Sequence, residues 1–197
     1  MKVVQVKCPK CSIPITMKQK DLLFYCDHCG VLHVRDGGVT ILDYEIADFR
    51  RGVPTENLIY VPFLRMYSHF VIHQARSEGG GLFKLSEWIK GGTGNSGDIF
   101  IFVPAVDFDP PIFKQLSIMF TKNPAKYTNR MDFANVPRMP ASITMKEAME
   151  LADFVVVTME AEKPGVLQQL DYSLNVVDAR VIYLPFISNS EGLTSAL

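Results

Sequence analysis

The four cysteines of the chain fall into two C-x-x-C pairs near its start. Cys8 and Cys11 form the first pair, Cys26 and Cys29 form the second, and fourteen residues separate the two pairs. Each pair can direct two sulfur atoms to one metal ion through a tight turn, so the two pairs supply the four ligands of a tetrahedral ion. The soft thiolate ligands and their spacing predict one Zn²⁺ per chain as the cofactor.

Four thiolates fill a tetrahedral shell and leave no position for water or substrate. Such a closed site is structural, and we expect that removing the metal unfolds the segment around it. His28 lies inside the second pair and His33 just beyond it. Either could replace a cysteine as a ligand, but the shell is already full. We therefore interpret both as hydrogen-bonded surface histidines.

The residues around the cysteine pairs predict short β-strands. Residues 12–17 and 22–25 suit the arms of a hairpin, with a polar turn at residues 18–21. Residues 31–35 and 39–42 suit a second hairpin, because Asp-Gly between them is a strong turn signal.

The cysteine pattern resembles that of the zinc ribbon family. The four cysteines match its ligand positions, and Pro9 and Gly30 stand where such turns often carry these residues. The resemblance covers residues 5–42 and implies a small β fold held by a structural zinc, but no particular function. Rubredoxins share the paired turns with pairs further apart; the short gap and Ser12 after the first pair favour zinc over redox iron.

Composition limits the class of protein. Hydrophobic residues make up 48% of the chain and charged residues 21%, which is a globular composition. The start of the chain does not resemble a signal peptide, and no apolar run is long enough to span a membrane. We therefore expect a cytoplasmic protein, and in a reducing compartment paired cysteines more often bind metal than form disulfides.

Charge is spread unevenly along the chain although the net charge is only -1. Residues 1–35 hold six bases and two acids, residues 36–110 six and ten, residues 111–146 six and one, and residues 147–197 two and eight. We interpret these blocks as ordinary solvated surfaces. The near-zero total speaks against a protein whose whole body binds nucleic acid.

The sequence predicts an α+β fold, in which an N-terminal β zinc ribbon precedes a larger, mostly antiparallel α+β domain. Residues 1–42 form the ribbon, and residues 43–57 are polar and are interpreted as a linker or a short helix and turn. Residues 58–187 form the α+β domain, and residues 188–197 form a frayed tail. Hairpin patterns outnumber strand–helix–strand units in the larger domain, which argues against a doubly wound parallel sheet.

Several elements of the larger domain are predicted from local patterns. Residues 64–73 alternate between apolar and polar, which indicates a strand with one buried face. We expect helices at 111–121 and 144–152, a central strand at 153–158, and a C-terminal hairpin that turns near Asp178.

Three segments share an apolar–aromatic–aliphatic–Pro pattern, at residues 59–63, 101–105 and 182–186. Because proline cannot donate to a central ladder, we expect each to mark a strand end, an edge or a bend.

Other candidate sites are weaker. Asp107 and Asp109 form a D-x-D after an apolar strand and could hold a divalent cation, but Asp109 is better explained as a helix cap. His69 and His73 could share a metal only on a helix. The glycine-rich segment around Trp88 lacks a phosphate-loop ending, and we interpret it as a flap.

These observations favour a non-enzymatic adaptor or accessory subunit with a structural zinc, which makes protein–protein contacts. No catalytic residue is predicted. A first alternative is a ribbon that binds nucleic acid; a second is a metal-dependent enzyme that uses Asp107 and Asp109. The residues offered to nucleic acid would be Lys7, Lys10, Lys18 and Lys20 with Phe24 and Tyr25.

Overall fold

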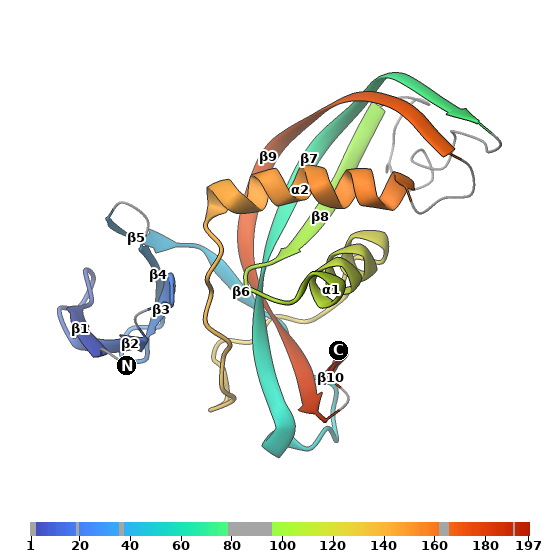
Figure 1. Ribbon diagram of the computed structural model, residues 1–197. Helices are drawn as coiled ribbons and strands as arrows, with labels where there is room; N and C mark the ends of the chain where they lie inside the picture. Colours follow the sequence, from blue (N-terminus) through green and yellow to red (C-terminus); the bar gives the residue numbers. More distant parts are fainter. Residues whose placement is uncertain (1–2, 19, 36–37, 79–95, 162–165, 191) are drawn as a thin grey trace.

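A computed structural model describes the chain except for residues 1–2, 19, 36–37, 79–95, 162–165 and 191. Figure 1 shows a small N-terminal module of short strands beside a long, curled sheet that carries two helices. The elements in chain order are β1 (Val3–Lys7), β2 (Pro14–Lys18), β3 (Leu23–Cys26), β4 (Val31–Arg35), β5 (Val39–Leu42), β6 (Tyr44–Ile46), the 3₁₀ helix η1 (Thr55–Asn57), β7 (Leu58–Glu78), β8 (Ser96–Pro104), α1 (Pro110–Lys122), α2 (Met145–Ala161), β9 (Val166–Asn189) and β10 (Gly192–Ser195).

The N-terminal module consists of two small antiparallel sheets. One is the β1–β2 hairpin and the other is the meander β3–β4–β5. The first cysteine pair is the turn of the β1–β2 hairpin, and the second is the turn of the β3–β4 hairpin. The expected pairing of residues 12–17 with 22–25 is wrong, because β1 supplies the partner of β2. The second predicted hairpin is confirmed by the pairing of β4 with β5.

The larger sheet has the order β10–β9–β7–β8, and all of these pairs are antiparallel. β6 joins the same sheet by pairing in parallel with β9. The predicted fold class, mixed α+β with mostly antiparallel strands, is therefore confirmed. β7 and β9 pair along almost their whole length and form the long axis of the molecule (Figure 1).

The predicted C-terminal hairpin is wrong. β9 is one continuous strand, and the segment that resembled a turn is a β-bulge. Tyr67 pairs with Asp178 and Ser68 pairs with Val176, so Val177 is the extra residue and its side chain is 61% exposed. A bulge bends the strand and locally increases its twist. The bend helps the sheet to curl without a break in the chain.

Of the three prolines expected at a strand end, an edge or a bend, two lie inside long strands. Pro104 ends β8 as expected, whereas Pro62 lies inside β7 and Pro185 inside β9. The carbonyl of Pro62 accepts from the Ala105 N–H, just past the end of β8, and the carbonyl of Pro185 accepts from the Ala196 N–H, just past the end of β10. Each missing proline N–H therefore falls where a neighbouring strand stops, and no ladder bond is lost there.

Both helices pack on the larger sheet. α1 extends the predicted helix at 111–121 by one residue at each end, so that prediction is confirmed. The predicted strand at 153–158 is wrong, because this segment continues α2. The buried side chains of α2 recur at helical spacing and share one cluster with residues of the sheet. They are Ala148, Ala152, Val155, Val156 and Met159.

Thr144 caps α2 through a reciprocal capping box. The Glu147 N–H donates to Thr144 Oγ1 over 3.2 Å, and the Thr144 N–H donates to Glu147 Oε2 over 2.8 Å. Two N–H groups that the helix leaves unpaired are thereby satisfied.

The hydrophobic core lies on both faces of the sheet. Leu64, Met66 and Phe70 point from one face of β7 toward α2, as the alternation predicted. On the other face, Phe63 packs edge-on against Phe120 of α1, with ring centroids 5.3 Å apart. α1 thus packs on the face opposite α2 through Phe120, while its Phe113 joins the cluster on the α2 face.

Two segments expected to be irregular contribute to the sheet. Part of the segment expected to be a linker forms β6, and the adjacent Ala47 is fully buried. The expected frayed tail is wrong, because β10 pairs with β9 and Ala196 is fully buried. The predicted flap around Trp88 lies outside the described residues. Neither helix in the described part of the chain is long and apolar enough to cross a membrane.

Candidate metal centre

The four cysteine sulfur atoms converge at the meeting point of the two hairpin turns. All four lie within 4.8 Å of one another. The sulfurs of Cys8 and Cys29 are 3.7 Å apart, and those of Cys11 and Cys26 are 3.6 Å apart. With zinc–sulfur bonds of about 2.3 Å, the edge of a regular tetrahedron is about 3.8 Å. The cluster therefore has the size needed to hold one tetrahedral metal ion.

The backbone of the two turns is closely equivalent. The Ser12 N–H donates to the Cys8 carbonyl over 2.8 Å, and the Gly30 N–H donates to the Cys26 carbonyl over 2.8 Å. Ser12 has φ +62° and Gly30 has φ +65°, so both occupy the left-handed region that closes the turn. Ser12 thus adopts the same conformation as Gly30 without being glycine.

The surroundings of the sulfur atoms lower the pKa of one thiol and raise the pKa of another. Cys8 and Cys26 are buried, while Cys11 and Cys29 are half-buried. Burial acts to raise the pKa of the Cys8 thiol, but hydrogen bonds from the backbone N–H groups of Cys11 and Lys10 and from the His33 ring lower it to about 6. Burial and the neighbouring thiols raise the pKa of Cys29 to about 12. Four sulfurs this close need a cation before all of them can ionise.

His33 is the residue of this site that was interpreted incorrectly from sequence. It is not at the surface but fully buried, and its ring stacks on Phe24 with centroids 5.2 Å apart. Its Nε2 lies 3.3 Å from the Cys8 sulfur, within reach for a ring N–H to donate to that sulfur. Its Nδ1 has no hydrogen-bond partner in the described part of the chain. His28, in contrast, is exposed as expected.

The cysteine module is joined to the larger sheet by hydrogen bonds. The Leu22 N–H donates to the Ala141 carbonyl over 2.7 Å, and the Ala141 N–H donates to Asp21 Oδ1 over 3.0 Å. Tyr44 of β6 donates from its hydroxyl to the Gly30 carbonyl over 2.8 Å. Gly30 belongs to the second cysteine turn, so this turn is fixed directly to the sheet.

Apolar packing joins the two parts as well. Leu23 and Leu32 of the module are buried in the same cluster as the α2 face of the larger sheet. Arg138, from the irregular segment before α2, lies over the ring of Tyr25 at 5.1 Å and over that of Phe133 at 4.6 Å. The module is thus packed against the larger sheet as part of the folded body.

The other metal candidates do not come together. His69 and His73 lie on strand β7, where four residues span about 13 Å, so the shared-metal interpretation is wrong. His69 Nδ1 instead lies 2.9 Å from Asp98 Oδ1, and His73 Nε2 lies 3.1 Å from Ser173 Oγ. Asp98 also accepts from the Tyr67 hydroxyl over 2.6 Å, and these contacts hold the pKa of its carboxyl below the usual range.

The D-x-D segment is a helix start rather than a cluster of ligands. Asp109 is the N-cap residue of α1, as expected, although its side chain makes no capping hydrogen bond. Asp107 is exposed, and its backbone N–H donates to Ser142 Oγ over 2.8 Å. Within the described ranges, the four cysteines are the one group of three or more potential ligands that meets.

The aromatic residues proposed for nucleic-acid stacking are already engaged. Phe24 is 3% exposed and packs with Cys8, Ile15 and Cys26 in the core of the module. Tyr25 is half-buried beneath Arg138. Neither ring is free to stack on a base, which leaves the lysines of the module without the aromatic platform that the nucleic-acid alternative requires.

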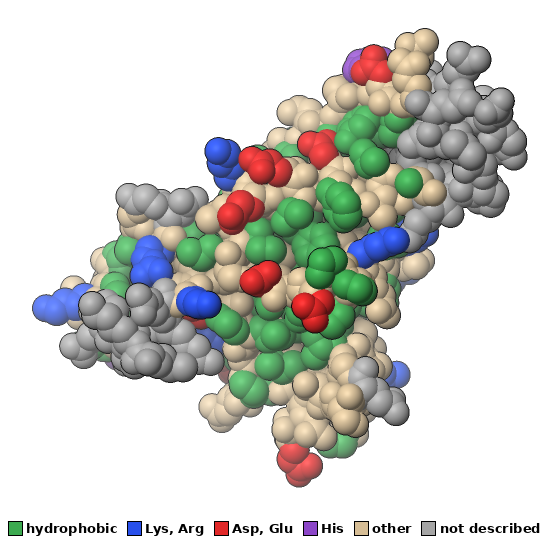
Figure 2. Space-filling model, viewed as in Figure 1, with side chains coloured by type: hydrophobic (Ala, Val, Ile, Leu, Met, Phe, Trp, Pro, Cys, Tyr) green, Lys and Arg blue, Asp and Glu red, His purple; other side chains and the backbone are tan. Residues whose placement is uncertain are grey.

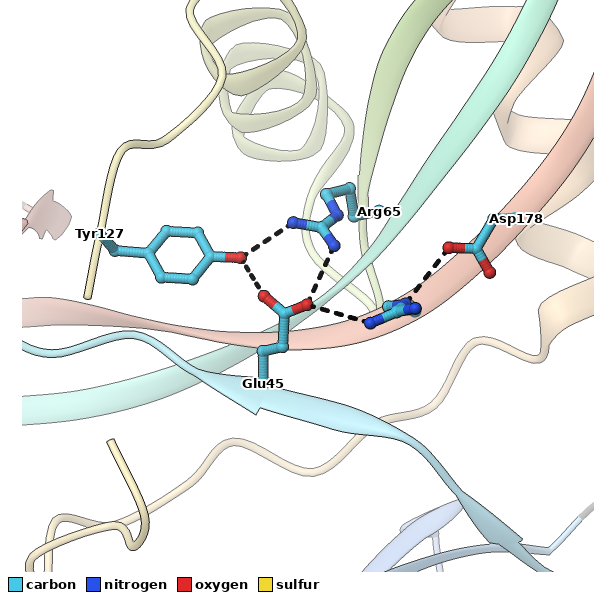
Figure 3. A network of polar contacts seen from close by, with 5 residues as sticks. Glu45, Arg65, Tyr127 and Asp178 are labelled. Atoms are coloured by element: carbon cyan, nitrogen blue, oxygen red, sulfur yellow. Dashed lines mark hydrogen bonds and ion pairs between the residues drawn. The ribbon is translucent and has the colours of Figure 1, made fainter. Parts of the chain in front are cut away.

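Sequence reasoning missed a polar network on the sheet, shown in Figure 3. Glu45 of β6 accepts from Arg65 of β7 over 3.0 Å and from the Tyr127 hydroxyl over 2.6 Å. Arg180 of β9 lies 3.6 Å from the same carboxylate and 3.2 Å from Asp178. The network ties β6 to two sheet strands and to the irregular segment after α1. No local sequence pattern predicts this network, because its members come from four separate stretches of the chain.

Comparison of the chain with family models, with curated proteins and with solved structures finds no match. Function is therefore inferred from the chemistry of the cysteine cluster and from the surfaces of this chain alone.

Proposed function

We propose that the chain is a zinc-binding protein in which Cys8, Cys11, Cys26 and Cys29 hold one structural Zn²⁺ in a module of the zinc ribbon type. We further propose that it works as a non-enzymatic accessory protein that contacts a protein partner. The observation that carries the zinc proposal is the convergence of four sulfur atoms within 4.8 Å from two equivalent hairpin turns. Four soft sulfur donors in a tetrahedral arrangement suit zinc.

A structural role follows from the closed ligand set. Four protein ligands leave no position at which zinc could polarise a substrate or activate a water molecule. The metal would instead replace the hydrophobic core that so small a module lacks, since its own buried cluster, among the described residues, consists of Cys8, Ile15, Phe24 and Cys26. Because Gly30 is bonded to Tyr44, a metal at the turns would also hold the module against the sheet.

The zinc proposal is tested by measuring the metal content of the purified full chain by inductively coupled plasma mass spectrometry. We expect one zinc per chain in the natural protein. Cys26→Ser should lose most of it, because a serine hydroxyl is a poor zinc ligand at neutral pH. His28→Ala is the matched control, since His28 lies inside the same turn but is exposed, and it should keep its zinc. Zinc that stays bound in Cys26→Ser would reject the proposal.

The accessory role is tested separately, by native mass spectrometry of the tagged full chain isolated from its own cells. We expect a defined complex with another protein that survives purification at moderate salt. A chain that is recovered only as a monomer, although it carries its zinc, would contradict the accessory role and leave the zinc proposal intact.

A further inference from the structure

An apolar groove lies between the start of α1 and the outer face of α2. Figure 2 shows hydrophobic side chains gathered over α2 and toward α1, with acidic side chains among them. Phe154 of α2 is 52% exposed and Val157, one turn later, is 41% exposed. A phenylalanine of this exposure on a helix that already buries its opposite face against a sheet is a candidate contact residue.

The groove is an open pocket of about 290 Å³. This is at the small end of ligand pockets, so it suits one large side chain better than a cofactor or a drug-sized molecule. Its walls are almost entirely apolar. The residues that line it include Val106, Phe108, Phe113, Ile143, Leu151 and Phe154.

Four carboxylates lie near this groove, together with Lys146 in the first turn of α2. Asp107 lines the pocket itself, and Asp109 precedes the first residue of α1. Glu147 and Glu150 lie seven and four residues before Phe154, on the same face of α2. None of these four side chains has an ion pair within the described part of the chain. Lys114, on the next turn of α1, is already engaged by a neighbouring group.

We propose that this groove is the docking site for a Lys/Arg-rich segment of a partner protein, which inserts one large apolar side chain beside Phe154. The basic residues of the segment would face the carboxylates of Asp107, Asp109, Glu147 and Glu150. The proposal rests on the accessory role proposed above, to which it adds a surface and a partner chemistry. It does not depend on the identity of the metal.

The charge pattern decides between possible occupants. A second copy of the chain, docked face to face through the same groove, would bring the two sets of carboxylates together, which is unfavourable. A nucleic acid or an anionic membrane would meet the same repulsion. A basic peptide with an apolar anchor gains from both features of the groove, the pocket and its acidic surroundings.

The test uses the full zinc-loaded chain and two labelled peptides of the same length with identical leucine and phenylalanine positions. One peptide carries lysine at its polar positions and the other carries glutamate. Fluorescence anisotropy should show binding of the lysine peptide that weakens as salt rises, and no binding of the glutamate peptide.

Variants then locate the binding. Phe154→Ala should lower the affinity for the lysine peptide about 10-fold or more, as truncation of an interface anchor does. Ile41→Ala is its control, because Ile41 is 57% exposed but lies on β5 of the module, and it should leave binding unchanged. The double variant Asp107→Asn/Glu150→Gln should weaken binding and flatten its salt dependence, whereas Glu56→Gln/Asp171→Asn should not.

Equal binding of the two peptides, or binding that Phe154→Ala leaves unchanged, would overturn the docking proposal. A shift to dimer that Phe154→Ala abolishes, measured by light scattering without peptide, would assign the groove to a second copy and also overturn it. If the peptide tests fail but native mass spectrometry finds a stable natural complex, the accessory role is retained and the contact lies elsewhere on the chain.

Discussion

The Glu45 network offers a sharp test of how β6 is held to the large sheet. The change is Glu45→Gln, which keeps the shape of the side chain and removes its charge. The carboxylate is 17% exposed and Arg65 is 22% exposed, so this pair is only weakly screened. Arg180 is 47% exposed, so its contact with Glu45 is largely screened by solvent.

The expected cost follows from these contacts. Losing the charge-assisted bond from Arg65 should cost about 1.5 kcal/mol, and weakening the short bond from the Tyr127 hydroxyl about 1 kcal/mol more. The exposed contact with Arg180 adds about 0.5 kcal/mol at most. We therefore expect Glu45→Gln to lower the free energy of unfolding by about 3 kcal/mol. For a chain of this size that corresponds to a fall in melting temperature of about 6–12 °C.

Thermal unfolding followed by circular dichroism measures this change. Glu56→Gln is the matched control, because Glu56 is exposed, and it should shift the melting temperature by no more than about 1 °C. A double-mutant cycle with Tyr127→Phe should give a coupling energy of about 1 kcal/mol. A cost below 1 kcal/mol for Glu45→Gln, or an equal cost for Glu56→Gln, would refute the view that the network anchors β6.

Three further predictions concern the module and α2. Leu32→Ala removes a fully buried side chain between the module and the sheet, so it should lower the free energy of unfolding, measured in urea, by about 2–5 kcal/mol. Ile41→Ala should change this free energy little. His33→Phe keeps the stack on Phe24 but removes the donor to Cys8, so zinc affinity in a chelator competition should fall about 10-fold; unchanged affinity would mean the donor is not used. The backbone N–H and hydroxyl of Thr144 hold the pKa of Glu147 below its usual range. The natural chain should therefore have a higher free energy of unfolding than Glu147→Gln at neutral pH. This difference should disappear as the pH falls from about 5 to about 3, because Glu147 then becomes protonated. A difference that persists at pH 3 would show that the charge of Glu147 is not its cause.

The cysteine cluster could be predicted because its signal is local. Two C-x-x-C pairs define turns, and the turns define ligand directions before anything is known about the rest of the fold. The role of His33 could not be predicted in the same way. Its proximity to Cys8 arises from the pairing of β3 with β4, which brings the ring over Phe24.

Errors in the larger domain came from signals that non-local partners override. The Val-rich run in α2 resembles a strand because β-branched residues favour sheets, yet its buried residues follow a helical period once the sheet lies beneath them. Asp178 resembled a turn because it stands between two strand-like segments, but continuous pairing with β7, more than one hundred residues earlier, makes this position part of a bulge. The polar network and the acidic groove also join distant segments, so only the folded chain reveals them.

The most direct test of the account is X-ray absorption spectroscopy at the zinc edge on the purified full chain. A closed structural site predicts four sulfur neighbours at about 2.3 Å and no nitrogen or oxygen neighbour. A first shell of three sulfurs with one nitrogen or oxygen would contradict this account, because it would mean that His33 or a water molecule binds the metal and that the site is not closed by the four cysteines.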